Sequence, residues 1–162
     1  MSSVIYFART KEEAVIPSKR EEDGAFDIYS CFDEAYRKIN PHETVLIPTG
    51  ISSAFSSDYV AIIKERSSTG SKGIGQRCGV IDSGYRGEWF IALTNHNEQL
   101  LVIAKEEVKE DFPGCIVYPY EKAICQCLMV EVPKLEVQEI SREDLLAMKS
   151  LRGTGALGSS GK

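Results

Sequence analysis

The feature that most constrains this chain is a succession of short β-rich runs, each closed by turn-forming residues. The runs cover residues 45–51, 59–65, 88–94, 100–104, 115–120 and 123–132. Val, Ile, Tyr, Phe and Trp suit a pleated, half-buried surface, and the Gly, Pro, Asn, Asp and Ser residues between the runs favour turns. Many short strands with little helical periodicity predict an all-β fold, either a barrel or a jelly-roll-like sandwich.

One window has a helical pattern, at residues 141–150 with the sequence SREDLLAMKS. Ser141 is a residue type that caps helix N-termini, and Asp144 stands three residues on, as in a capping box. Leu145, Leu146 and Met148 follow. The pattern predicts one short helix near the C-terminus, with its apolar residues as a docking face.

At 162 residues the chain is predicted to form one domain. Residues 94–123 are long for a strand connection, where about 4 to 6 residues are typical, and they include the charge run KEEVKED. We interpret this stretch as a solvated insertion around residues 96–121, a hairpin with a long loop. The predicted organisation is a β domain over residues 1–151, followed by a flexible glycine-rich tail over residues 152–162.

Composition limits the partners and the compartment. The net charge of -5 lacks the basic footprint of a nucleic-acid-binding domain, so no direct nucleic-acid binding is expected. The opening MSSVIYFART is too short and polar for a signal peptide, and no run approaches the roughly 18 apolar residues of a membrane span. Five cysteines without a C-x-x-C pair, and only two histidines, favour reduced core thiols in a cytoplasmic protein over a zinc site.

Four polar clusters contain the residues suited to chemistry. They are GAFDIYS with Asp27, RSSTGSKG from Arg66, GVIDSGYRGE from Gly79, and RGTGALGSSG from Arg152. Each is ambiguous alone: an isolated Asp is typical of a turn, and Ser/Gly/Lys loops are common. The second cluster is not a P-loop, but its backbone N–H groups can form an anion-binding nest, and arginine offers a bidentate fork for phosphate.

The order of these clusters, with Gln126 in AICQCLMV between the third and the last, resembles the five motifs of the trimeric dUTP pyrophosphatase (dUTPase) family. The resemblance covers nearly the whole chain, and GVIDSGYRGE is its most specific part. It implies a dUTPase-like distorted jelly-roll barrel and a homotrimer with shared active sites. It also implies hydrolysis of dUTP to dUMP and pyrophosphate by Mg²⁺-assisted water attack at the α-phosphate, which limits uracil in DNA and supplies dUMP for dTMP synthesis.

The resemblance also implies a role for individual residues. Asp82 would orient the attacking water, a task that suits an aspartate because it is ionised at neutral pH. Uracil and deoxyribose would be bound by Gly79, Val80, Ile81, Tyr85 and Phe90, with Leu157 over the base. Phosphates would be bound by Arg66, Ser67, Ser68 and Gln126, and by Arg152, Gly153, Gly155, Gly158 and Ser159 of a closing lid. Asp27 would support the metal shell through water, or would support Arg66.

Three features depart from the family pattern. Ala123 stands where the fourth motif carries a basic residue, and Leu157 replaces the tail aromatic that stacks on uracil, beside Ala156 in place of a glycine. Loss of a base–aromatic stack, about 1 to 3 kcal/mol, predicts weaker lid closure without loss of chemistry. The insertion resembles those of some phage dUTPases.

Two alternatives stay open at this point. A dCTP deaminase of the same fold carries a catalytic glutamate ten residues after the third-motif aspartate position, where this chain has Ala92. A nucleotide-sensing or repressor-binding protein without catalysis is the other. The presence of Asp82, Tyr85 and Gln126 argues against loss of catalysis and leaves room for a second role.

Overall fold

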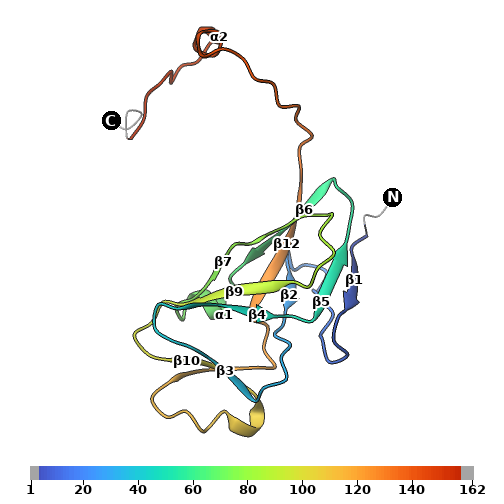
Figure 1. Cartoon of the computed structure of the whole chain (residues 1–162), viewed down its shortest axis with the longest axis vertical. Coiled ribbons are helices and arrows are strands. Elements are labelled where there is room, and N and C mark those ends of the chain that lie inside the picture. The colour runs from blue at the N-terminus through green and yellow to red at the C-terminus, as the bar shows by residue number, and fades with distance from the viewer. Residues whose placement is uncertain (1–3, 158–162) are drawn as a thin grey trace.

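The computed structural model describes residues 4–157, which form a β-rich body and a long C-terminal arm that extends away from it (Figure 1). The strands are β1 (Tyr6–Arg9), β2 (Phe26–Ile28), β3 (Tyr36–Ile39), β4 (Thr44–Pro48), β5 (Ile51–Ala54), β6 (Tyr59–Lys64), β7 (Ile74–Arg77), β8 (Val80–Ile81), β9 (Phe90–Asn95), β10 (Leu101–Ala104), β11 (Ile116–Pro119) and β12 (Cys125–Glu131). The helices are α1 (Ser67–Gly70) and α2 (Arg142–Ala147), and η1 (Glu106–Val108) is a 3₁₀ turn. The predicted all-β class is confirmed.

The strands form four small sheets, ordered β1-β5, β11-β10-β3, β2-β12-β6-β8 and β4-β9-β7. Among the described residues none of these sheets closes into a barrel, as in a distorted jelly roll. The core between them contains Trp89, whose indole N–H donates to Ser53 Oγ at 3.2 Å. The β2-β12-β6-β8 sheet carries Asp27, Gln126, Val80 and Ile81 of the predicted site residues, and Arg66 and Asp82 follow shortly after β6 and β8.

The run at residues 45–51 is two strands in different sheets instead of one. Gly50 breaks it with a φ of 66°, a conformation that glycine adopts without strain. A Cβ atom at Gly50 would lie 2.8 Å from Ala14 Cβ and 2.9 Å from Cys31 Sγ. The corner between β4 and β5 therefore requires glycine, because Ala14 and Cys31 pack closely against it.

Residues 94–123 do not form the solvated hairpin that the charge run suggested. All four residues of β10 are buried, and β10 pairs antiparallel with β3 and parallel with β11. Parallel neighbours need a crossover connection, and the charged segment provides it through η1. The apolar run Leu101–Ala104 explains why β10 is buried, because a central strand covered on both faces is apolar throughout.

The arm leaves the body after β12, well before Arg152. The start of the arm is held to the body by a hydrogen bond from the Val132 N–H to the Asp58 carbonyl, at 2.8 Å, and by an ion pair between Lys134 and Asp58. The predicted helix is confirmed as α2, and Ser141 Oγ accepts a hydrogen bond from the Asp144 N–H at 3.0 Å. The apolar residues of α2 are exposed, so the docking face stays a prediction.

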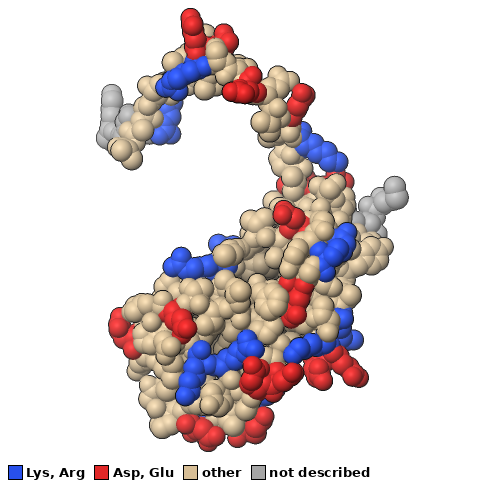
Figure 2. All heavy atoms as spheres, in the orientation of Figure 1, with Lys and Arg blue, Asp and Glu red and all other residues tan. Residues whose placement is uncertain are grey.

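All five cysteines are free thiols, and Cys31, Cys125 and Cys127 pack in the core. Burial raises the pKa of the Cys127 thiol to about 12. Cys78 is exposed, so the expectation of core-filling thiols is wrong at that position. Across residues 4–157 no helix is long and apolar enough to cross a membrane. Figure 2 shows acidic and basic side chains interspersed on the face in view.

Candidate active site

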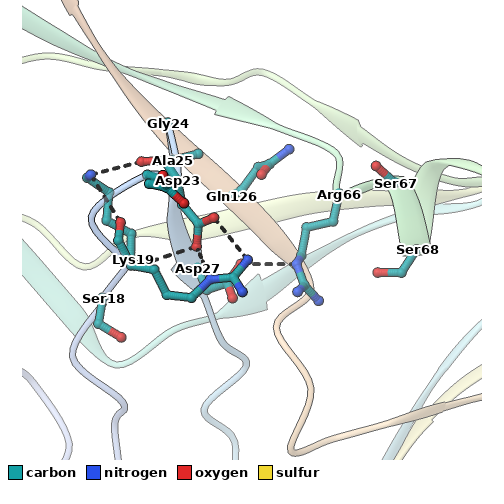
Figure 3. Close-up of a pocket in the computed structure, with 12 residues that line it drawn as sticks. Ser18, Lys19, Asp23, Gly24, Ala25, Asp27, Arg66, Ser67, Ser68 and Gln126 are labelled. Carbon is teal, nitrogen blue, oxygen red and sulfur yellow. Dashed lines mark hydrogen bonds and ion pairs between the residues drawn. The ribbon is translucent and has the colours of Figure 1, made fainter.

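A cavity of about 820 Å³ opens where β2, β12 and the start of α1 meet (Figure 3). Its lining residues are Ser18, Lys19, Arg20, Glu22, Asp23, Gly24, Ala25, Asp27, Arg66, Ser67, Ser68 and Gln126. Asp27 and Gln126 are direct partners in the β2–β12 register. The structure thus brings together predicted residues from three distant parts of the chain.

Arg66 is held in place from several directions. Its Nε lies 3.0 Å from Asp27 Oδ1 in an ion pair, and its Nη1 donates to the Ala123 carbonyl at 3.3 Å. Its backbone N–H donates to Thr69 Oγ1 at 3.1 Å, and the Thr69 hydroxyl donates back to the Arg66 carbonyl. This reciprocal cap starts α1 directly after Arg66, which places Ser67 and Ser68 on the cavity wall.

Gln126 is fixed by the neighbouring strand. Its Nε2 donates to the Glu65 carbonyl at 2.8 Å, and Glu65 in turn accepts a hydrogen bond from the Gln76 N–H at 3.0 Å. That backbone hydrogen bond holds the pKa of the Glu65 carboxyl below its ordinary value. The Gln126 amide therefore has a defined orientation at the cavity, beside the ion pair of Asp27 and Arg66.

A second, smaller pocket of about 250 Å³ lies on the hairpin that follows β8. Val80, Ile81, Asp82, Tyr85, Glu88 and Phe90 line it. The Tyr85 N–H donates to the Asp82 carbonyl at 3.1 Å, and the Tyr85 hydroxyl donates to the Glu88 carbonyl at 3.0 Å. These two contacts fix the aromatic ring, 44% exposed, next to an exposed Asp82.

Two glycines allow this hairpin to form. A Cβ atom at Gly79 would lie 2.9 Å from the Ile63 carbonyl oxygen, and one at Gly87 would lie 2.6 Å from Tyr85 Cζ. Beyond the turn, Glu88 Oε1 accepts a hydrogen bond from the Gly50 N–H at 2.8 Å, and the buried Trp89 anchors the chain in the core. The hairpin is thus a rigid support for the residues that line its pocket.

The two pockets have no lining residue in common. In the antiparallel register of β6 and β8, Ile81 pairs with Ala61, so Asp82 follows at the level of Val60. Arg66 lies beyond the other end of β6. At about 3.3 Å per residue, Val60 and Arg66 are separated by about 20 Å. Within one chain, Asp82 and Arg66 therefore lie at opposite ends of the sheet.

The predicted tail residues are not brought to either pocket of the same chain. Arg152, Gly153, Gly155 and Leu157 lie on the exposed arm beyond α2 (Figure 1). Arg152 Nε donates to the Gly155 carbonyl at 2.9 Å, a contact within the segment itself. The predicted Gly158 and Ser159 lie outside the described residues.

Sequence reasoning missed two sets of residues. One is the charged loop before β2, where Arg20 donates to both Asp23 carboxylate oxygens, at 2.9 and 3.0 Å, on the wall of the larger cavity. Its signal was the run SKREED next to the first motif. The other is Tyr118, whose buried hydroxyl donates to the Ala123 carbonyl that also binds Arg66. No motif could have revealed it, because Tyr118 lies between the third and fourth motifs.

The donor set at the larger cavity fits a magnesium ion held mainly by a substrate. The described residues contain no group of three or more His, Cys, Asp or Glu side chains arranged to hold a metal. Asp27 is the carboxylate beside Gln126, and it is already paired with Arg66. Mg²⁺ commonly keeps several waters and binds one or two carboxylates together with substrate phosphates. Asp27 can therefore contribute through water but cannot form an all-protein site.

Comparison with known proteins identifies the family of this chain. The family model described as dUTPase matches residues 11–108, more than half of the chain. The deoxyuridine 5'-triphosphate nucleotidohydrolase of Clostridium tetani is 31% identical over 156 residues, which are 94% of this chain and 92% of the relative.

Solved dUTPases share the fold. A mutant dUTPase of Staphylococcus bacteriophage 80alpha with dUpNHpp matches with a TM-score of 0.77 and 20% identity, over 98% of this chain and 99% of that chain. A mutant dUTPase of phage phi11 of S. aureus, which coordinates a structural Mg(II) ion, matches with a TM-score of 0.68 and 18% identity, over 86% of this chain and 97% of that chain. From the family model and the curated relative, the chain belongs to the dUTPase family.

Proposed function

We propose that this protein hydrolyses dUTP to dUMP and pyrophosphate, and that Asp82 orients the water that attacks the α-phosphate. The observation that carries this assignment is the pocket that joins an exposed Asp82 carboxylate to the fixed Tyr85 ring. Family membership supports the same reaction. By removing dUTP, the enzyme limits uracil in DNA and supplies dUMP for dTMP synthesis.

The hairpin pocket would bind the nucleoside. Backbone groups at Gly79, Val80 and Ile81 would meet the uracil edge, with Phe90 beside them. The Tyr85 ring would pack against the deoxyribose and occupy the space of a 2′-hydroxyl. Its tie to the Glu88 carbonyl keeps the ring from moving aside.

The larger cavity would bind the triphosphate. Arg66 supplies a planar fork, and Ser67, Ser68 and Gln126 supply hydrogen-bond donors. A bound Mg²⁺ ion would neutralise charge on the phosphate oxygens, and Asp27 would hold it through its water shell. The arm would bring Arg152 and its glycines over the phosphates as a lid, with Leu157 covering the base.

The reaction asks the protein mainly for positioning and charge stabilisation. The water held by Asp82 forms the new bond to the α-phosphorus, and the bond to the bridging oxygen of pyrophosphate breaks. The water proton passes to the Asp82 carboxylate, while the cationic groups at the phosphates stabilise the leaving group.

We also propose a homotrimer with shared active sites, in a reducing cytoplasmic compartment to which the five free thiols are suited. The separation of about 20 Å between Val60, which lies level with Asp82, and Arg66 supports sharing, because Asp82 and Arg66 of one chain do not face the same pocket. A second copy would supply the missing half of each site.

Mixing two inactive variants tests the shared site. Asp82→Asn and Arg66→Ala are each expected to be nearly inactive alone. Co-refolded in equal amounts, they should recover about a quarter of wild-type turnover per chain, because some sites combine an intact Asp82 with an intact Arg66 from another subunit. Pyrophosphate release and light scattering on the same samples measure activity and assembly. Each variant refolded with itself is the control, and an inactive mixture of correct mass would contradict sharing.

Selection against ribonucleotides is expected to depend on Tyr85. Wild-type kcat/KM for UTP should be about 100-fold or more below that for dUTP, since the fixed ring leaves no room for a 2′-hydroxyl. Tyr85→Ala should lower the ratio of kcat/KM for dUTP to kcat/KM for UTP by at least about tenfold. Tyr85→Phe, which keeps the ring, should preserve most of the preference for dUTP. Equal hydrolysis of UTP and dUTP by the wild-type enzyme would remove Tyr85 from this role.

The dCTP deaminase alternative is disfavoured by the residue at the deaminase glutamate position. Ala92 is buried in β9, between Leu46 of β4 and Arg77 of β7 in the sheet, and provides no carboxylate. Incubation with dUTP, dCTP, dTTP and UTP side by side, with assays for pyrophosphate and ammonia, separates the two activities. We expect pyrophosphate from dUTP and no ammonia from dCTP.

A further inference from the structure

Tyr118 of β11 makes a contact that links the insertion to the phosphate end of the site. The side chain is only 3% exposed, and its hydroxyl donates a hydrogen bond to the Ala123 carbonyl. The same carbonyl accepts the hydrogen bond from Arg66 Nη1 at 3.3 Å. One backbone oxygen therefore receives a donor from β11 and a donor from the segment after β6, which uses both of its lone pairs.

The position of Ala123 lets its carbonyl oxygen connect two sheets. Ala123 is 2% exposed and precedes β12, the strand that carries Gln126. Tyr118 is fixed in turn by β11, where it pairs with the buried Ile103 of β10. The contact thus joins the β11-β10-β3 sheet to the sheet that bears the phosphate-binding residues.

The direction of the hydrogen bond is fixed by chemistry. A carbonyl only accepts, so the Tyr118 phenol must be protonated to make the contact. Burial raises the pKa of Tyr118, an effect that the nearby Arg66 and Ser68 partly offset. The phenol consequently stays a donor at neutral pH, within reach of two residues that line the larger cavity.

The guanidinium of Arg66 is held at two nitrogens: Nε forms an ion pair with Asp27, and Nη1 donates a hydrogen bond to the Ala123 carbonyl. A long side chain held at both points loses little further freedom when it binds phosphate. Without Tyr118, the loop that carries Ala123 loses its side-chain tie to β11, and one anchor of Arg66 is free to shift.

We propose that Tyr118 is a positioning residue for Arg66, and that the insertion at residues 96–121 supports triphosphate binding through it. This inference rests on the phosphate role proposed for Arg66. It gives the insertion a function in the reaction that no sequence motif assigns.

Tyr118→Phe tests the inference by removing one hydroxyl and little else. The matched control is Tyr120→Phe, because the Tyr120 hydroxyl is also partly buried but contacts the Phe32 N–H, at 3.3 Å, away from both pockets. Loss of one hydrogen bond predicts a fall in kcat/KM for dUTP of about tenfold in Tyr118→Phe, expressed mainly as a higher KM. Tyr120→Phe should stay within about twofold of wild type.

A double-mutant cycle separates positioning from general loosening of the fold. In the Arg66→Ala background, Tyr118→Phe should have no further effect on kcat/KM, because its action passes through Arg66. Melting temperatures of the two Tyr→Phe variants should fall by similar small amounts. The same loss of kcat/KM with and without Arg66, or an equal loss in Tyr120→Phe, would overturn the inference.

The cycle also distinguishes failure of the positioning role of Tyr118 from failure of the phosphate role of Arg66. If Arg66→Ala lowers kcat/KM while Tyr118→Phe does not, the phosphate role of Arg66 stands and the inference about Tyr118 is wrong. If Arg66→Ala retains wild-type kcat/KM, the proposed phosphate role fails, and the positioning role fails with it.

Discussion

Asp82→Asn is expected to lower kcat for dUTP by a factor of about 10³ while leaving substrate affinity nearly unchanged. An asparagine has the same shape but can neither accept the water proton nor orient the water by charge, and general-base catalysis contributes about 10² to 10⁴. Asp82 is exposed on the hairpin, and among the described residues its side chain makes no hydrogen bond or ion pair that folding would need. The loss should therefore be chemical and not structural.

The measurement pairs single-turnover rates with calorimetric binding of dUpNHpp, a non-hydrolysable analogue. The dissociation constant should stay within about threefold of wild type, since the nucleoside contacts and the phosphate donors remain. Asp33→Asn, which removes another exposed carboxylate that pairs with Lys11, is the matched control and should keep full turnover. Unchanged turnover in Asp82→Asn would show that another group positions the water.

The hairpin pocket was predictable from sequence because its contacts are local. Asp82, Tyr85 and Glu88 lie within seven residues, and their mutual hydrogen bonds follow from one turn. Gly79 and Gly87 stand where a Cβ atom would collide with Ile63 or Tyr85. A short motif can specify such a unit completely, so recognising GVIDSGYRGE was sufficient to place its residues.

The larger cavity was predictable only as a set of residues. Its geometry depends on strand order, since β12 must lie between β2 and β6 before Asp27 and Gln126 become partners. The ion pair of Asp27 with Arg66 follows from that order, so Asp27 supports Arg66 in addition to the water-mediated metal role proposed for it. Periodicity predicts that a run is a strand, but it does not say which strand becomes its neighbour.

The remaining errors arose where a local signal competed with a distant one. The charge run KEEVKED predicts a solvated loop within residues 94–123, although Leu101–Ala104 beside it forms the buried centre of a sheet. Parallel pairing of β10 with β11 has no sequence signature of its own. The contact of Tyr118 with Ala123 depends on that pairing, and it was invisible for the same reason.

Truncation after Ser150 is expected to lower turnover by about 100-fold or more, with the melting temperature of the body nearly unchanged. In the described part of the tail, residues 151–157, the hydrogen bonds are made within residues 150–155, so their removal takes no contact from the body. The arm leaves the body at Val132, and an extended chain spans up to about 3.3 Å per residue. In the proposed homotrimer, this length of chain would let Arg152 reach a pocket on another subunit.

The size of the loss follows from what closing the tail costs and what it provides. Ordering a residue costs on the order of 1 kcal/mol or more, and charge-assisted hydrogen bonds from Arg152 and glycine N–H groups to phosphate must offset that cost. Leu157 gives the base less than an aromatic ring would, so the balance in this chain is close.

Leu157→Phe should therefore raise apparent affinity for dUTP by about threefold or more, with kcat unchanged or higher. Leu151→Phe, which enlarges another fully exposed leucine before the glycines, is the matched control and should change neither constant. Steady-state kinetics and thermal melts on the wild type, the truncated protein and the two Leu→Phe variants measure kcat, KM and melting temperature. Wild-type turnover in the truncated protein would show that the tail takes no part in catalysis.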